Sequence, residues 1–503
     1  MKKFLRILLI FVTFFTAKNV LAKNNLNINQ ENQKLINWMR SNVSPITGLP
    51  LSFFVQEKDK QRVFENMGEG RSAEGIIERM IVNEGLDIYD GAVYQIVLSM
   101  LGGSENLSLA YHPLSLYWEG SVNQTANIRA GFPINTFIYD EHHPEAVSSD
   151  LLRKGDRGFI FRIINAHGRY HCKDPLDGKD SSFDFPMSER IHWEDWKPVA
   201  GENAWVTMAA MHLYHKKYFQ PEDHSYLQDL NSLELNLSEE LARAAIILQS
   251  EIGAVRMAPM GTYRSLTADE SVKYEENQWW YYQISTENNI SWYAAFRMLY
   301  QVTQKEEYKM MMDKIESFMK FSWNNEEGYF YQGAHFVDGS WQVNKEPFAL
   351  DVQTWAILCF SPERIDQWFG EGSAMRLWQK CKNLAGVFND DGSLKGVGYT
   401  TEHDRLSVEW SAGAIEAVKE LSKYYKSNQP LFDQELTADL ISMRKGVDSL
   451  RFDINDDQSA YSYSSKRAWI PFGWYSHEPS VLSLASTAWM VLVDMDINPF
   501  FLQ

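Results

Sequence analysis

The sequence predicts an all-α protein, an (α/α)6 toroid of alternating outer and inner helices with β-hairpin insertions at one mouth. Six apolar stretches recur along the chain, with Ala or Gly at crowded positions and an aromatic residue near the start. More polar, amphipathic stretches lie between them, as an outer layer requires. An open helical solenoid is the alternative. Because the hairpins fall on one type of connection, a closed ring with one elaborated mouth is favoured.

The helices follow from these two kinds of stretch. Small residues let helices approach closely, so the apolar stretches are predicted inner helices, at 89–101, 203–214, 290–302, 352–360, 410–421 and 484–493. Predicted outer helices carry charges on one face and lie at 33–43, 107–118, 239–252, 305–321, 372–387 and 434–449.

Several connections alternate apolar and polar residues around Gly or Asp-Gly turns, which is typical of β-hairpins. The clearest turns are Asp338-Gly339 and Asp391-Gly392. Hairpins are predicted at 254–264, 328–343, 387–399 and 461–474, and strand-like alternation runs over 158–171.

The composition excludes several classes of protein. The chain has 503 residues, of which 45% are hydrophobic, so it can bury a large core. Its 48 Lys and Arg against 66 Asp and Glu give a net charge of −18. This charge argues against a nucleic acid or an anionic membrane surface as the partner.

Residues 1–22 have the pattern of a signal peptide. Lys2, Lys3 and Arg6 precede an apolar run over 7–17 that is too short to span a bilayer, and Val20-Leu21-Ala22 gives the small-residue cleavage pattern. We therefore expect cleavage near Ala22, a mature chain of 23–503 that forms a single catalytic domain, and a periplasmic or secreted protein. No later stretch is long and apolar enough for a membrane anchor, and no anchor is expected.

Five of the six predicted inner helices open with a carboxylate, and the sixth opens with serines. The five acids are Asp90, Glu202, Glu287, Asp351 and Glu409. In a toroid the inner-helix N-termini surround one mouth, so these side chains are predicted to converge there. Taken singly, each is also explained as a residue that caps a helix or opposes its dipole.

Converging carboxylates and aromatic rings suit glycoside chemistry. Acetal hydrolysis needs one protonated acid and one carboxylate that activates water or attacks the sugar, and crowding keeps one acid protonated. We expect Glu287 to be the general acid and Glu409 the general base, with the other three acids binding substrate or replacing one of that pair. Candidate substrate contacts beside the acids are Tyr89, Trp205, Trp292 and Trp410, whereas Trp355 and Trp489 are assigned to the core.

Trp280, His403 and Asp404 are further candidate substrate contacts. Each has a plain alternative, which is hairpin packing for Trp280 and a solvated, ion-paired loop for His403 and Asp404. The sequence 466–474, with its Lys, Arg and aromatic residues, is a second candidate for a sugar-binding rim.

No metal or cofactor is expected. The chain has no CxxC pair, and its histidines are dispersed. Residues 453–459 resemble the start of a calcium loop but lack its Gly and its closing Glu, which favours a polar loop. Cys359 is predicted to be a buried core thiol rather than half of a disulfide.

The helix openings together resemble the six-hairpin, (α/α)6-barrel glycosidase superfamily. The segments that carry the resemblance are 89–92, 201–205, 285–296 and 407–410, in an order that covers 30–500. The resemblance implies carbohydrate hydrolysis, often with inversion, and an exported glycoside hydrolase acting on an oligo- or polysaccharide. A polysaccharide lyase or sugar epimerase on the same toroid, with His403 or Tyr399 as base, is one alternative. A non-catalytic glycan-binding protein is the other.

Overall fold

The structure is a computed structural model. It describes residues 29–68, 73–120, 136–137, 158–160, 162–168, 171–184, 199–227, 229, 231–258, 264–266, 272–274, 280–427 and 429–503. The predicted signal peptide lies outside these residues and stays a prediction, as does the single-domain division.

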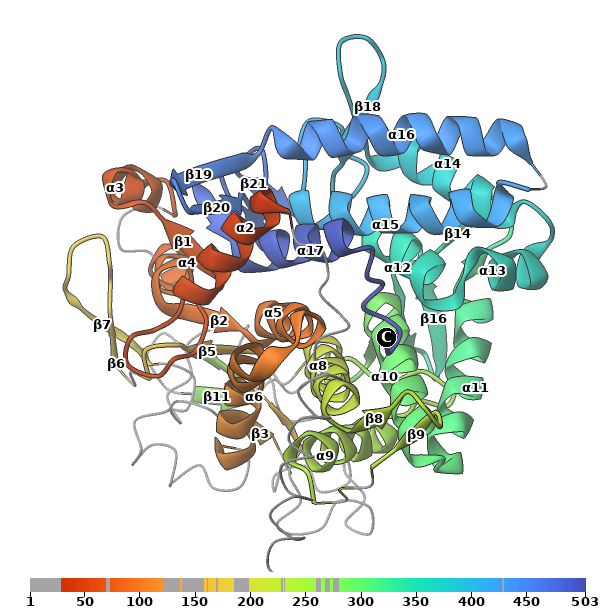
Figure 1. The fold of residues 1–503 in the computed structure, drawn as a ribbon, viewed down its shortest axis with the longest axis horizontal. Helices are drawn as coiled ribbons and strands as arrows, with labels where there is room; N and C mark the ends of the chain where they lie inside the picture. Colours follow the sequence, from red (N-terminus) through yellow and green to blue (C-terminus); the bar gives the residue numbers. More distant parts are fainter. Residues whose placement is uncertain are drawn as a thin grey trace, which may run out of the picture.

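Six inner helices form a closed ring (Figure 1). They are α5 (Ile88–Leu101), α8 (Ala200–Tyr218), α10 (Thr286–Thr303), α12 (Leu350–Phe360), α15 (Val408–Tyr425) and α17 (Leu484–Met495). Each contacts the next along the chain, and α17 contacts α5. That last contact closes the ring, so the predicted toroid is confirmed and the open solenoid is excluded.

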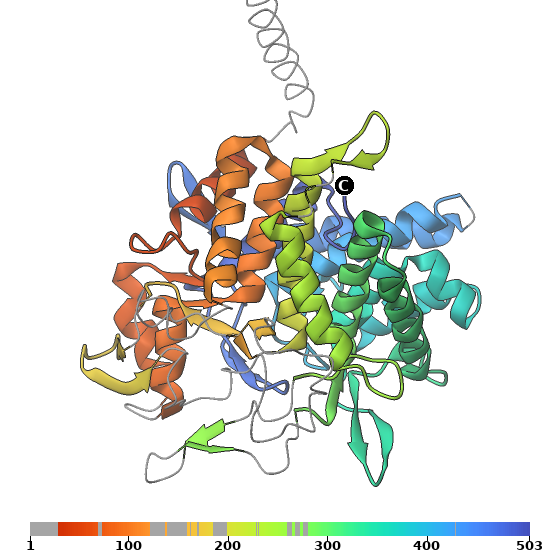
Figure 2. The same cartoon turned by 90° about the horizontal axis from the view of Figure 1, so that it is seen from below.

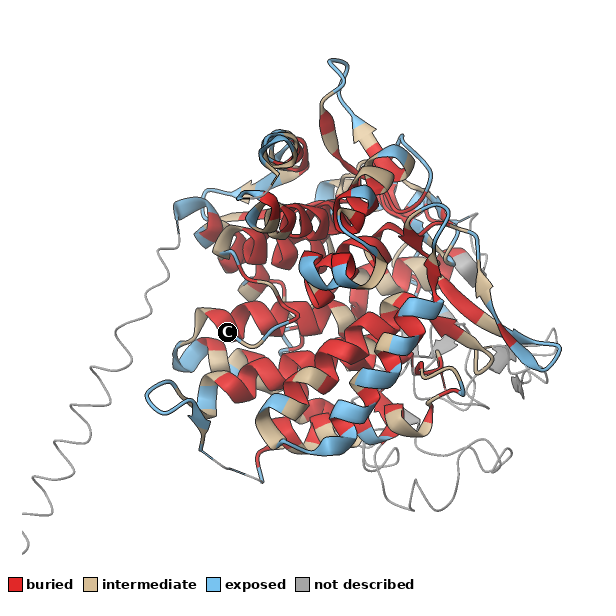
Figure 3. Ribbon diagram, turned by 90° about the vertical axis from the view of Figure 1, so that its right-hand side faces the viewer, coloured by how far each residue is buried: buried red, intermediate tan, exposed pale blue. Residues whose placement is uncertain are grey.

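Each inner helix packs against one outer helix. The outer helices are α6 (Gly103–Gly120), α9 (Leu233–Ile247), α11 (Glu306–Phe321), α14 (Ser373–Ala385), α16 (Pro430–Asp448) and α2 (Gln30–Ser41). Because α2 packs against α17, the first described helix completes the last pair. Figure 3 shows helices that are buried over most of their length and others that are exposed along one face, as the inner and outer helices respectively are.

In the described part of the chain, three further helices lie beside the ring: α3 (Glu57–Glu65), α4 (Ala73–Glu84) and α13 (Pro362–Phe369). Several helices begin earlier than predicted, among them α6, α9, α10 and α16. Helix α9 begins at Leu233 because the Ser232 hydroxyl accepts from the Leu235 N–H, and α16 begins at Pro430, whose fixed φ suits a first helical position.

Short strands make the connections. The predicted hairpins at 328–343 and 387–399 are confirmed by β15 (Gly333–Val337) with β16 (Ser340–Asn344) and by β17 (Gly386–Phe388) with β18 (Leu394–Val397). Figure 2 shows the β15–β16 hairpin projecting beyond one end of the helices. The other strands are β1 (Phe53–Val55), β2 (Gly85–Asp87), β3 (Thr136–Phe137), β4 (Phe159–Ile160), β5 (Ile163–Asn165), β6 (His171–Lys173), β7 (Asp180–Asp184), β8 (Phe219–Gln220), β9 (Ser225–Tyr226), β10 (Arg264–Leu266), β11 (Val272–Tyr274), β12 (Gln283–Ser285), β13 (Trp323–Asn324), β14 (Tyr329–Phe330), β19 (Arg451–Asn455), β20 (Gln458–Tyr461), β21 (Ala468–Ile470), β22 (Trp474–Ser476) and β23 (Val481–Ser483).

Two predicted hairpins have other boundaries. The 461–474 segment contains parts of two hairpins, β19–β20 and β21–β22, and residues 453–459 form the turn region of the first. The 254–264 segment is described only at 254–258 and at 264, and 254–258 contains no strand. Val255 makes only an isolated bridge to Gln249, because the Asn289 side chain occupies both backbone groups of Val255.

One polar side chain repeats at the fourth position of five inner helices, and we call these five residues the clamp residues. They are Asn203, Asn289, Gln353, Ser411 and Thr487. Asn203 accepts from the Ile160 N–H at 2.8 Å and donates to the Ile160 carbonyl at 2.9 Å. Asn289 binds Val255, Gln353 binds Phe330 and Ser411 binds Val397 through the same two backbone groups. Thr487 accepts from the Tyr461 N–H. The clamp residues therefore fix each helix start to a preceding connection.

The C-terminal tail closes one end of the ring. Asn498 donates to Leu358 O, and the carbonyls of Pro499 and Phe500 accept from His212 and Arg297. The tail is thereby bound to three inner helices, α12, α8 and α10, and Figure 1 shows the C-terminus inside the ring.

Two smaller findings complete the fold. Cys359 is a buried free thiol, as predicted, and so is Cys381. None of the helices in the described ranges combines the length and apolar character needed to cross a membrane.

The clamp residues make a testable prediction. Asn289→Ala leaves the buried N–H and carbonyl of Val255 without their partner, and we expect the unfolding free energy to fall by about 3 kcal/mol. Urea unfolding measures this loss. Asn389→Ala, at an exposed turn position, is the control and should change stability by no more than about 0.5 kcal/mol. Equal effects of the two substitutions would contradict the role of the clamp.

Candidate active site

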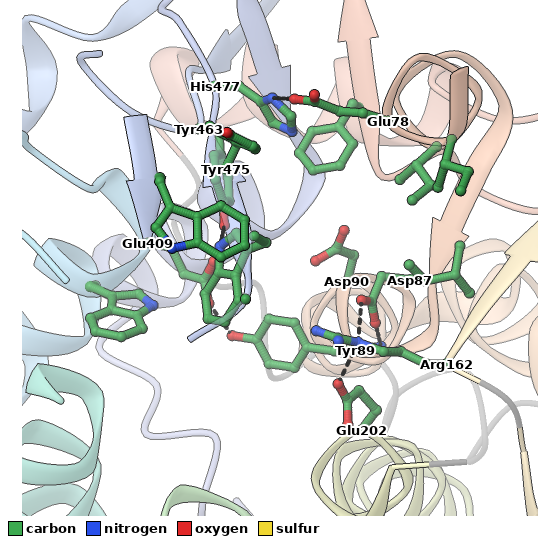
Figure 4. Close-up of a pocket in the computed structure, with 18 of the residues that line it drawn as sticks. Glu78, Asp87, Tyr89, Asp90, Arg162, Glu202, Glu409, Tyr463, Tyr475 and His477 are labelled. Atoms are coloured by element: carbon green, nitrogen blue, oxygen red, sulfur yellow. Dashed lines mark hydrogen bonds and ion pairs between the residues drawn. The ribbon is translucent and has the colours of Figure 1, made fainter. Parts of the chain in front are cut away.

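A cavity of about 1040 Å³ lies at the N-terminal ends of the inner helices. All five predicted carboxylates line it, together with Asp87, Tyr89 and Arg162. Figure 4 shows Asp90, Glu202 and Glu409 among them. The prediction that the helix openings converge on one mouth is therefore confirmed for Asp90, Glu202, Glu287, Asp351 and Glu409.

Other residues cap most of these helices, so the acids have another role. The hydroxyls of Ser285 and Ser407 accept from the backbone of the next helical turn in α10 and α15. Asp87 caps α5 by accepting from the Tyr89 N–H at 3.0 Å. The Glu287 and Glu409 side chains, each two residues after its capping serine, are left to face the cavity.

Glu409 is held by a buried phenol. Tyr89 Oη donates to Glu409 Oε1 at 2.5 Å and itself accepts from Trp489 Nε1 at 2.8 Å. Burial raises the pKa of Glu409, and the Tyr89 hydrogen bond lowers it. The Asp351 and Asp87 charges also raise it, and the pKa that results from all these causes is about 7. Tyr89, a predicted substrate contact, thus lines the cavity and also orients a carboxylate.

Glu287 is the more strongly perturbed acid. Burial raises its pKa well above the usual range, and the neighbouring Asp351 and Glu202 charges add to the shift. The amide of Asn288, oriented with its nitrogen toward Glu287 Oε2 at 2.6 Å, accepts from the Gly201 N–H at 3.3 Å. A Cβ at Gly201 would lie 2.2 Å from the Asn288 side chain, so only glycine lets these two helix starts meet.

An arginine links two further acids. Arg162 Nε lies 2.8 Å from Glu202 Oε1 and 3.4 Å from Asp87 Oδ2 (Figure 4). Burial raises the pKa of Asp87 well above its usual range, while Arg162 lowers it. Burial also raises the pKa of Asp90 to about 8, against a hydrogen bond from Ser52.

The tryptophans separate by helical position. Trp205, Trp355 and Trp489 all occupy the sixth position of their helices, where the side chain faces the ring axis. Trp205 and Trp355 pack with centroids 5.1 Å apart and line the cavity. Trp355 and Trp489 are both buried in the core as predicted, and Trp355 in addition lines the cavity. The small residues Ser291 and Gly413 occupy the same position in α10 and α15 and leave room for the indoles.

The prediction that Trp292 is a substrate contact was wrong. It lies at the seventh position of α10, and one residue turns a helix by about 100°. Its ring therefore faces away from the axis, is fully buried against Phe159 and Phe296, and donates to Ala200 O. Trp410, by contrast, lines the cavity as predicted.

Three other predicted contacts lie outside the cavity lining. Trp280 is in the turn before β12. His403 Nδ1 binds Gly386 O at 2.7 Å, and Asp404 forms an exposed ion pair with Lys466. For His403 and Asp404 the structure agrees with the alternative of an ion-paired loop.

Sequence reasoning missed Glu78 and His477 (Figure 4), which meet Arg467 of the candidate rim at the other side of the cavity. Arg467 binds Glu78 through both guanidinium nitrogens, one at 2.7 Å, and His477 Nδ1 lies 3.4 Å from the same carboxylate. Burial and the Arg467 charge lower the pKa of His477 to about 3, so the imidazole is neutral. The three residues come from α4, the position before β21 and the loop after β22, and only the basic motif at 466–467 gave a signal.

No three His, Cys, Asp or Glu side chains within the described ranges converge closely enough to hold a metal ion.

Solved structures with the same fold include several sugar enzymes. The chain is similar to a cellobiose 2-epimerase from Bacillus thermoamylovorans, with a TM-score of 0.53, 10% identity, and coverage of 94% of this chain and 98% of that one. It is similar to a D-mannose isomerase, with a TM-score of 0.52, 11% identity and coverage of 94% and 97%. It is also similar to a cellobiose 2-epimerase from Spirochaeta thermophila, with a TM-score of 0.51, 10% identity and coverage of 94% and 98%. No protein-family model and no curated protein matches the chain. These likenesses agree with the closed helical ring.

The carboxylates predict a pH-dependent stability. Burial raises the pKa of Asp351 from its usual 3.8 to about 7. Because the folded protein disfavours the ionised form of the Asp351 carboxyl, this residue lowers the free energy of unfolding as the pH rises from about 4 to about 8. We expect Asp351→Asn to raise the Tm by roughly 2–4 °C at pH 8 and to leave it unchanged at pH 4, as measured by calorimetry. An equal Tm difference at both pH values would contradict the shifted pKa.

Proposed function

We propose that this protein is a glycoside hydrolase that acts on an oligo- or polysaccharide by carboxylate acid/base catalysis with inversion. The observation that carries the proposal is the pairing of two differently held acids in one aromatic-lined cavity. Burial and neighbouring charges raise the pKa of Glu287 and so favour its protonated form, whereas the phenol of Tyr89 favours the ionised form of Glu409.

The reaction divides between the two acids. Glu287 donates its proton to the glycosidic oxygen as the bond to the anomeric carbon breaks. Glu409 accepts a proton from a water molecule whose oxygen bonds to the anomeric carbon. The water supplies both the new hydroxyl of the sugar and the proton that Glu409 takes up, so atoms and charge balance.

The charge of the cavity supports a neutral sugar rather than a uronate. The two arginines in the lining, Arg162 and Arg467, both pair with carboxylates of the cavity. A lyase must neutralise the carboxylate of its uronate before it removes the adjacent proton, and a cavity with this excess of acids opposes that step. This argument disfavours the lyase alternative.

A sugar epimerase or isomerase is the second candidate, because the solved structures of similar fold carry those names. The bases considered for such a reaction support it poorly. His403 and Tyr399 lie outside the cavity lining, and His477, which lines it, has its pKa lowered to about 3. A base this weak removes a proton from carbon slowly.

We also propose that the protein is exported and that residues 1–22 are removed. The basic start, the short apolar run and the cleavage pattern support this. N-terminal sequencing of protein from periplasmic or culture fractions should begin near Lys23. A secreted chain that still begins at Met1 would contradict cleavage.

The acid/base assignment is tested with Glu287→Gln and Glu409→Gln. Each should lower the release of reducing ends from an oligosaccharide by roughly 10²–10⁴-fold, because each removes one proton transfer. Circular dichroism checks folding, and Glu306→Gln, at the exposed start of α11, is the control with unchanged activity.

Isotopes separate the candidate reactions. Hydrolysis in ¹⁸O-water places the label at the new anomeric hydroxyl, whereas epimerisation in deuterated water places deuterium on carbon. Carbon-bound deuterium without ¹⁸O would replace the hydrolase proposal with the epimerase. Glycan binding without either label would favour a non-catalytic binding protein.

A further inference from the structure

The β21–β22 hairpin forms the exposed side of the cavity. Trp469, Trp474 and Tyr475 of this hairpin line the same cavity as the five acids. Exposure rises from the floor outward, from 0% at Trp205 and 7% at Trp410 to 40% at Tyr475 and 51% at Trp469. The aromatic lining therefore continues from the buried acids to the solvent.

The hairpin presents its rings from a fixed base. Arg467, immediately before β21, is bound to Glu78 of α4 and stacks against Tyr475 at 4.4 Å from the ring centroid. Arg405 Nη1 donates to the Trp469 carbonyl at 3.1 Å. Because both strands are held in this way, binding a ligand here costs little conformational entropy.

Trp469 and Tyr475 lie directly opposite each other on the two strands, with ring centroids 5.0 Å apart and planes at 70°. Cross-strand aromatic pairs also stabilise hairpins without binding any ligand, and a second hairpin of the chain has a pair in that role. Phe336 and Trp341 form the equivalent pair on β15–β16, at 5.3 Å. There Trp341 is buried and donates to Glu251, whereas Trp469 keeps half its surface free beside the cavity.

We propose that Trp469 and Tyr475 form an outer sugar subsite, which stacks on the apolar face of a second, neutral sugar residue joined to the one beside the acids. The inference rests on the proposed function in taking the ligand to be a glycan. Arg467 is already paired with Glu78, so this subsite selects by ring stacking and not by charge. The preferred ligand is therefore an oligosaccharide and not a monosaccharide.

Calorimetric binding to the full chain carrying Glu287→Gln separates this inference from catalysis. The probes are neutral β-1,4-gluco-, β-1,4-manno- and α-1,6-manno-saccharides, from the monosaccharide to the tetrasaccharide. In this background Trp469→Ala should weaken binding of the longer members roughly tenfold and change monosaccharide binding by less than about twofold. Trp469→Tyr, which keeps a flat ring, should retain most of the affinity.

Phe336→Ala is the matched control, because it removes an exposed ring from a cross-strand pair whose hairpin does not line the cavity. It should leave binding at every length unchanged. Thermal unfolding confirms that each variant is folded.

The outcomes are distinct. A loss in Trp469→Ala that is equal at all lengths, or no loss, overturns the subsite, and so does a protein that binds none of the three series. Length-dependent binding without release of reducing ends supports the subsite and contradicts the proposed hydrolysis.

Discussion

The site depends on the clamp residues, the polar side chains at the fourth position of five inner helices. Four of them bind both backbone groups of a residue in an earlier connection, as Asn289 binds Val255. Each such bond is buried, where an unmet backbone group costs about 1–3 kcal/mol. The carboxylates lie one or two residues before the clamps, so their direction follows from the clamp. Helix α5 has Gly91 at this position, and there β2, paired with β5, leads directly into the helix.

This rigidity matters because the negative charges of the acids repel one another. Asp351 and Glu202 raise the pKa of Glu287, and Asp351 and Asp87 raise that of Glu409. A looser frame would let these side chains turn toward water and regain their ordinary acidity. The packed indoles and the Arg162 bridge prevent this movement. The buried acids therefore lower the stability at the mouth, and burial raises the pKa values of Asp351 and Glu409 to about 7.

The ring and its five acids were predictable because both depend on local pattern, namely apolar periodicity and an acid in the first helical turn. The helical face was harder to predict. Trp292 and Trp355 differ by one position in their helices, and only the start of each helix, fixed by β12 or by the Gln353 clamp, decides which ring meets the axis. Glu78 and His477, the partners of Arg467, were missed because α4 and the β21–β22 hairpin meet across almost 400 residues, through contacts that no local pattern encodes.

The C-terminal tail closes the barrel at one end and leaves the other end open. Phe500 is fully buried and packs edge-on against Trp205 and Trp355, the two indoles at the floor of the cavity. The ring is therefore a blind cup rather than a tunnel in the described part of the chain. A polymer cannot thread through it from one side to the other. Under the proposed function, a glycan enters and leaves on the side where the inner-helix starts and the β21–β22 hairpin line the cavity, so one chain has to dissociate before the next one binds.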